Sequence, residues 1–203
     1  GTHPVQNLSI VGAMAYANYY GLRLPNKEEI IKAANGMNAW DYVWGPTPNL
    51  DSNAGELSEY MNSDTYSQCD GFHNPWAATD NYITQTTTPV GYFNGSTYYY
   101  PDGFIDLQSC EPIFEVTTQN AVSPYGLYDI NGNVKEMTST YLTQGGHTPN
   151  YLALGGSNNL DSYYNRTTVQ SAFCNGGSYG SNFGCGSGDS SFRVARTLNS
   201  TSE

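Results

Sequence analysis

The chain has 203 residues, of which 12% are charged and 14% are aromatic, and its formal net charge is −11 at pH 7. This length suits a single domain with one hydrophobic core, and a surface so acidic repels a phosphate backbone, which argues against nucleic acid as a direct partner. No apolar run approaches the roughly 20 residues needed to span a bilayer, so insertion into a membrane is not expected.

Helical signals are confined to the first fifth of the chain. Ser9 is the expected N-cap of a helix over residues 10–20, because a serine side chain can accept a hydrogen bond from the N–H groups that the first turn leaves unpaired. Asn26 is the expected N-cap of a second helix, with Glu29 three residues later as in a capping box, and Gly36 is expected to end it.

The rest of the chain has little periodicity and many turn residues. Its abundant tyrosine and tryptophan side chains are expected to hold the loops in place. Three short segments have the composition or alternation of strands, namely residues 89–93, 151–154 and 192–196. The sequence therefore predicts one α+β domain over residues 1–203, most of it irregular.

The four cysteines form no C-x-x-C pair, so a zinc site is poorly supported. They permit two disulfides in three connectivities, of which Cys174–Cys185 is the easiest to close. Four unpaired thiols fit the sequence equally well. The cysteines are Cys69, Cys110, Cys174 and Cys185.

Six segments between His3 and Arg196 follow one another in a characteristic order: HPVQNLSIVGAMAYANYYGLRLPNKEEIIKAANG, YVWG, TTPVGYF, YGLYDINGNVKEM, LGGS and FRVAR. Together they resemble the sulfatase-modifying-factor family, which includes the formylglycine-generating enzyme. The resemblance implies a variant of the C-type lectin fold, with two short helices, a small twisted sheet and long structured loops. Family domains usually carry further strands before the first segment, so the resemblance implies either an N-terminally abbreviated domain or a fragment of a longer product.

The resemblance does not extend to the chemistry of the enzyme. The enzyme has a reactive cysteine pair shortly after its GGS segment, and by spacing those positions fall here on Leu160 and Asn165. Neither side chain can form the thiolate that copper-dependent oxidation of a substrate cysteine requires. The histidines also lack the spacing of metal ligands; they are His3, His73 and His147. We therefore expect no enzymatic activity.

Residues 125–137 are the segment that agrees best with the family, in which this turn commonly holds a structural Ca²⁺. The ligands that the resemblance carries over are the side chains of Asp129 and Glu136 and the carbonyls of Gly132 and Val134. Carboxylates and carbonyls are the oxygen ligands that Ca²⁺ prefers. The alternative is a hydrogen-bonded turn without metal, in which Asp129 and Asn133 accept from nearby backbone N–H groups.

Residues 158–191 have an unusual alphabet, because lysine, glutamate, methionine and tryptophan are all missing from them. The residue types present are largely those reached by changing the adenines of an AAY asparagine codon. This resembles the variable proteins of diversity-generating retroelements, in which adenine positions are randomised during reverse transcription and copied into the 3′ end of a gene. The resemblance implies a variable region at about residues 155–196. The alternative is an ordinary low-complexity polar loop.

The same alphabet suits a binding surface, because tyrosine offers large amphipathic contacts while serine, glycine and asparagine adapt their hydrogen bonds, as in antibody loops. Val169, Ala172 and Phe192 are the expected fixed residues behind this surface. The predicted ligand-contacting residues are Asn158, Asn159, Asp161, Tyr163, Tyr164, Asn165, Asn175, Ser178, Tyr179, Ser181, Asn182, Phe183 and Asp189.

The predicted function is that of a non-catalytic ligand-binding protein with a hypervariable C-terminal surface. Such a protein would act outside the cell, on a virion or a cell surface, and would bind a protein or cell-surface ligand. Two alternatives stay open on the sequence. One is a fixed calcium-dependent lectin or adhesin, since acidic loops and aromatic side chains also suit sugars. The other, less well supported, is an oxidase of the sulfatase-modifying-factor type.

Overall fold

The structure, a computed structural model, describes residues 3–38, 40–45, 87–105, 112–142, 150–157, 165–173 and 189–198. The predicted α+β class is confirmed in these residues, which contain helices and small sheets joined by irregular segments. The elements are α1 (Ile10–Tyr19), α2 (Lys27–Asn35), β1 (Thr97–Ile105), β2 (Pro112–Thr117), β3 (Lys135–Leu142), β4 (Asn150–Leu154), β5 (Gln170–Phe173) and β6 (Ser190–Phe192). None of the described helices is long and apolar enough to cross a membrane.

Both helices begin as their sequences predict. The Ser9 hydroxyl accepts a hydrogen bond from the Gly12 N–H at 3.1 Å, which caps α1. In α2 the Asn26 side chain accepts from the Glu29 N–H at 2.8 Å, and the Glu29 carboxylate accepts from the Asn26 N–H at 2.8 Å. This reciprocal capping box satisfies two backbone donors that the first turn would otherwise leave unpaired.

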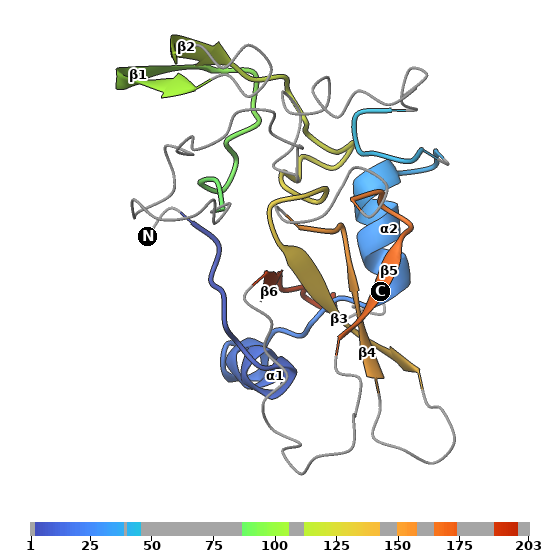
Figure 1. Cartoon of the computed structure of the whole chain (residues 1–203). Coiled ribbons are helices and arrows are strands. Elements are labelled where there is room, and N and C mark those ends of the chain that lie inside the picture. The colour runs from blue at the N-terminus through green and yellow to red at the C-terminus, as the bar shows by residue number, and fades with distance from the viewer. Residues whose placement is uncertain are drawn as a thin grey trace.

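A four-stranded sheet in the order β5-β4-β3-β6 forms the centre of the described structure (Figure 1). β3 pairs antiparallel with β4 and parallel with β6, and β4 pairs antiparallel with β5. The hairpin of β1 and β2 forms a separate sheet that stands apart from the other strands in this view. The last strand therefore lies beside the first strand of the central sheet, although a long segment separates them in sequence.

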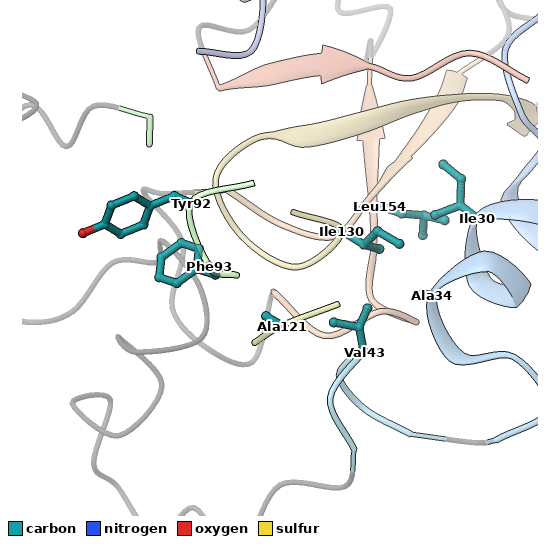
Figure 2. Close-up of a cluster of buried hydrophobic side chains, with 8 residues drawn as sticks. All are labelled: Ile30, Ala34, Val43, Tyr92, Phe93, Ala121, Ile130 and Leu154. Carbon is teal, nitrogen blue, oxygen red and sulfur yellow. The ribbon is translucent and has the colours of Figure 1, made fainter. Parts of the chain in front are cut away.

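The two helices contact opposite faces of the central sheet. Ala153 on β4 belongs to a buried cluster with residues of α1, whereas its neighbour Leu154 belongs to a cluster with Ile30 of α2. Successive strand residues point to opposite faces, so the two clusters lie on either side of the sheet. Figure 2 shows the second cluster, in which Ile30, Ala34, Val43, Tyr92, Phe93, Ala121, Ile130 and Leu154 converge from separate segments.

Of the three predicted strands, one is confirmed, one is a turn and one is shifted along the chain. Residues 151–154 are confirmed, because they form most of β4. Residues 89–93 are not a strand: the Tyr92 N–H donates to the Pro89 carbonyl at 3.1 Å, and Gly91 has φ +74°, which makes a tight turn. Residues 192–196 are displaced, since β6 ends at Phe192 and the chain continues into an isolated bridge at Ala195.

Candidate functional site

Residues 129–134 form the turn that leads into β3, and several buried hydrogen bonds meet there; we call it the polar turn. Asp129, Gly132 and Asn133 all have positive φ, at 58°, 74° and 62°. Asparagine, aspartate and glycine tolerate this left-handed conformation better than other residues do. Their presence within a few positions is the local reason that the chain can coil tightly here before it extends as a strand.

Two asparagines of this turn connect it to distant segments. The Asn131 amide oxygen accepts from the Val43 N–H at 3.0 Å, and its nitrogen donates to the Asn165 carbonyl at 2.6 Å. The Asn133 amide accepts from the Thr88 N–H at 2.9 Å and donates to the Thr88 carbonyl at 3.2 Å. Both asparagines are at most 3% exposed, so these amides satisfy backbone groups that water does not reach.

A pair of glycines lets the end of β4 pack directly against this turn. The Gly132 N–H donates to the Gly155 carbonyl at 2.7 Å. A Cβ atom on Gly155 would lie 2.0 Å from the Ile130 carbonyl oxygen, and one on Gly156 would lie 1.8 Å from the Asn165 amide oxygen. No other residue type fits there, which explains physically why glycines occupy this part of the LGGS segment.

The segment between Ser157 and Asp189 begins and ends at the same place. The Ser157 hydroxyl donates to the Asp189 carboxylate at 3.1 Å, and the Lys135 ammonium group lies 2.6 Å from the same oxygen. The Lys135 N–H also donates to the Asp189 carbonyl at 2.8 Å. The ends of this segment are thus held together by a largely buried ion pair, and β5 within the segment is held by its pairing with β4.

Two predicted ligand-contacting residues take part in these buried contacts. Asn165 is fully buried and Asp189 is 9% exposed, so the structure places neither on an open surface, and their role as ligand contacts stays a prediction. The alphabet of the segment could not separate them from their neighbours, because a short polar side chain serves a buried turn as well as a binding surface. The other predicted contact residues lie outside the described residues: Asn158, Asn159, Asp161, Tyr163, Tyr164, Asn175, Ser178, Tyr179, Ser181, Asn182 and Phe183.

Asp129 is the first predicted calcium ligand, and one of its oxygens is without a partner. Its Oδ2 accepts from the Gly91 N–H at 2.5 Å, while its Oδ1 is buried and has no hydrogen bond within the described structure. Burial raises the pKa of Asp129 to about 6; the Gly91 N–H opposes this, the charge of Glu136 adds to it, and Arg193 opposes it. The carboxylate is therefore a costly charge that a cation or a proton would stabilise.

Glu136, the second predicted carboxylate ligand, already has a cation. It is 4% exposed, and one of its oxygens accepts from Arg193 Nε at 2.5 Å while the other accepts from Arg193 Nη2. The same Nη2 donates to the Tyr128 carbonyl at 3.1 Å. Such a fork is the geometry in which guanidinium and carboxylate groups pair most strongly.

This arrangement does not fit calcium with the predicted ligands. Both Glu136 oxygens accept from Arg193, so a calcium ion bound by both oxygens in the plane of the carboxylate would have to displace the guanidinium. At about 4 Å from the guanidinium it would also meet a repulsion of roughly 8 kcal/mol at an effective dielectric constant of about 20. Gly132 keeps its carbonyl engaged with the Val134 N–H at 2.8 Å. Calcium at this turn stays a prediction, but two of its four carried-over ligands are committed to other partners.

No cluster of metal-binding side chains occurs in the described ranges. They contain no group of three or more His, Cys, Asp or Glu residues placed to hold a metal ion. His3 Nδ1 lies 3.0 Å from the hydroxyl of Thr87, which precedes the residue whose backbone pairs with the Asn133 amide. Leu160, the cysteines and the other two histidines lie outside the described residues. The geometry of the site allows it to hold the two ends of the segment between Ser157 and Asp189 in place.

Comparison with known proteins identifies the fold. The family model of the sulfatase-modifying factor enzyme 1-like domain (FGE-sulfatase) matches residues 1–198. The chain belongs to this family. None of the curated protein sequences compared with this FGE-sulfatase domain matches it.

Solved structures agree with the family. The domain is similar to CarF (TM-score 0.57, 18% identity), Treponema denticola variable protein 1 (0.58, 16%) and PvdO from Pseudomonas aeruginosa (0.57, 16%). These matches cover 98%, 96% and 97% of this chain, and 69%, 71% and 63% of the other chains. At such identities they establish a shared fold, and the predicted C-type lectin fold of the formylglycine-generating-enzyme subtype is confirmed.

Sequence reasoning missed the residues that do most to hold this site together. Asn131, Lys135 and Arg193 each lie within a family segment, but they were not assigned a role. The available signal was an asparagine on either side of a glycine, which marks a tight turn. That signal predicts the turn, whereas the partners of each amide depend on which distant segments the fold brings near.

Proposed function

We propose that this FGE-sulfatase domain is a non-catalytic ligand-binding protein whose C-terminal segment carries variable binding residues. The observation that supports this most directly is the way the segment is held. Its two ends meet at the contact of Ser157 with Asp189, and Asn165 anchors it to the buried Asn131. Rigid supports under long connecting segments are the usual arrangement of binding loops.

The chemistry of the chain supports binding over catalysis. The positions that correspond to the reactive cysteine pair of the enzyme are Leu160 and Asn165, and a buried asparagine amide offers no nucleophile. The residues between the anchors are rich in tyrosine, serine, glycine and asparagine, which suit protein recognition. A similar structure is named a variable protein, which agrees with the retroelement origin suggested by the alphabet of residues 158–191.

The proposal includes a place of action and a kind of partner. A binding segment of this composition would be displayed on a virion or a cell surface and would contact a protein or another cell-surface ligand. The net charge of −11 favours partners with neutral or basic surfaces, because an acidic partner would be repelled on approach.

Sequencing the DNA around the gene tests the origin of the segment. We expect a near-identical repeat that differs at adenines, next to a reverse transcriptase gene. The differences should fall in the codons of residues 158–164 and 174–188. The codons of Asn165 and Asp189 should be unchanged in the repeat, because both side chains are buried. These two codons serve as internal controls for the structural part of the argument.

Each outcome has a distinct meaning. A locus without repeat and without reverse transcriptase would contradict retroelement diversification, and an identical segment in many isolates would then favour a fixed lectin or adhesin. Differences concentrated at Asn165 and Asp189 would instead contradict their role as anchors. Copper-dependent oxidation of a cysteine peptide by the purified protein would contradict the non-catalytic part of the proposal.

A further inference from the structure

The contact between Glu136 and Arg193 joins the two parallel strands of the central sheet. Glu136 pairs in register with Ser191 of β6, and Met137 pairs with Phe192. Arg193 follows immediately, and its guanidinium turns back onto the Glu136 carboxylate. Its third contact, with the Tyr128 carbonyl, reaches the start of the polar turn. One side chain thus connects β6, β3 and the turn that the family resemblance assigns to calcium.

The charges around this contact are those that a metal ion would otherwise balance. Asp129, Glu136 and Arg193 line one cavity of about 320 Å³. Among the described residues that line this cavity, Arg193 is the only Lys or Arg, and both carboxylates interact with its charge. An arginine is permanently protonated, and its fork supplies fixed directions as well as charge. It can therefore neutralise a carboxylate and orient it, which are the two tasks of a structural calcium ion.

We infer that Arg193 is the resident cation of this turn and that it replaces calcium as the partner of Glu136, so that β6 is fastened to β3 without a metal. The inference goes beyond the proposed function, because it holds whether or not the C-terminal segment varies. It predicts that calcium does not change the stability of the domain. It also predicts that removing the guanidinium leaves the carboxylates of Asp129 and Glu136 available to a metal ion.

Thermal unfolding of three proteins in millimolar calcium and in EDTA tests this inference. Wild type should melt at the same temperature in both buffers. Arg193→Gln should melt lower than wild type in EDTA and should recover by several degrees in calcium, because Asp129 and Glu136 are then free to bind the ion. Magnesium in place of calcium should restore less, since the smaller ion tolerates irregular oxygen cages poorly.

Arg23→Gln is the matched control. Arg23 makes the same two-pronged contact with Glu29, with both N–O distances at 2.6 Å, but the two side chains are 39% and 40% exposed, whereas the Glu136 side chain is 6% exposed. Its loss should lower the melting temperature slightly and equally in both buffers. A calcium response in this control would mean that calcium acts on the protein in a general way, and the inference would then be abandoned.

Calorimetric titration of calcium into EDTA-treated wild type gives a second measurement, which does not require any variant to fold. No binding heat is expected. Heat that disappears in Glu136→Gln would overturn the inference, because Glu136 would then be a metal ligand in the native protein. A folded Arg193→Gln protein that does not respond to calcium would overturn it equally, since the turn would hold no cation site for Arg193 to fill.

Discussion

Helix α1 buries Ile10, Ala13 and Ala17 against the sheet, whereas the turn at residues 129–134 buries the amides of Asn131 and Asn133. The helix is held by apolar packing that tolerates many side chains of suitable volume. The turn is held by hydrogen bonds that each need one specific partner. The proposed variable segment would benefit from the second kind of contact, because specific hydrogen bonds fix the position of the chain as well as its stability.

This contrast implies that equivalent changes have unequal costs in the two regions. The side chains around α1 should be able to repack around a substitution. Near the polar turn a new side chain would contact backbone atoms, which are held in place by hydrogen bonds. The glycines with positive φ offer the cleanest comparison, since the same substitution can be made in both places. Differences between them then report surroundings and not the intrinsic preference of the new residue.

The largest effect is expected for Gly155→Ala. A Cβ atom there would lie 2.0 Å from the Ile130 carbonyl oxygen and would displace the strand from the turn. We expect a loss of about 4 kcal/mol or more in the free energy of unfolding, or failure to fold. Gly21→Ala is the control: φ is +66° and no atom lies within 4 Å of the added Cβ. It should cost about 1 kcal/mol, from the left-handed conformation alone.

Urea unfolding followed by circular dichroism measures both values. A cost for Gly155→Ala similar to that for Gly21→Ala would mean that β4 and the polar turn separate easily, and the contrast drawn above would fail. A large loss of stability in both variants would mean that the left-handed backbone conformation, and not the close contact with Ile130, determines the cost.

The second effect is a gain in stability that depends on pH. Asp129→Asn keeps the acceptor for the Gly91 N–H and removes a charge whose burial is unfavourable. Because the folded pKa is raised from 3.8 to about 6, the native state binds more protons than the unfolded state between these values, and wild type loses stability as pH rises through them. The shift corresponds to at most about 3 kcal/mol.

Melting temperatures of both proteins in EDTA, from pH 4 to pH 8, measure this effect. We expect similar values near pH 4 and a variant that is more stable by about 5 °C above pH 6, allowing for partial exposure of the residue. A difference that does not change with pH would show that the Asp129 carboxylate is not destabilised in the folded protein.

The sequence predicts contacts between neighbouring residues well and contacts between distant segments poorly. The caps at Ser9 and Asn26 were predicted correctly because donor and acceptor lie three residues apart. β5 and β6 were missed or displaced because their pairing depends on β4 and β3, which are far away in sequence. β1 was missed because a bulge between Tyr99 and Phe104 interrupts its register, so that turn-forming residues lie inside a strand.

The candidate site shows a further reason for the errors. Asn165 and Asp189 belong to the same alphabet as the residues around them, and only the fold reveals that one abuts Gly156 and the other pairs with Lys135. Asp129 and Glu136, which the family resemblance names as ligands of one ion, line the same cavity, and their role as ligands stays a prediction. The resemblance could not predict that Arg193 would occupy the carboxylate, because that contact depends on β6 lying beside β3.

The smallest effect is expected at the start of α1. Ser9→Ala removes the acceptor of the Gly12 N–H, and we expect a loss of about 1 kcal/mol. Ser9→Asp is the control, because an aspartate caps the helix equally well and its charge is favourable at a helix N-terminus. Urea unfolding should therefore place the aspartate variant at or above wild type. If both variants lose the same amount, the serine acts through a contact other than the cap, and α1 would share the dependence on specific partners that distinguishes the polar turn.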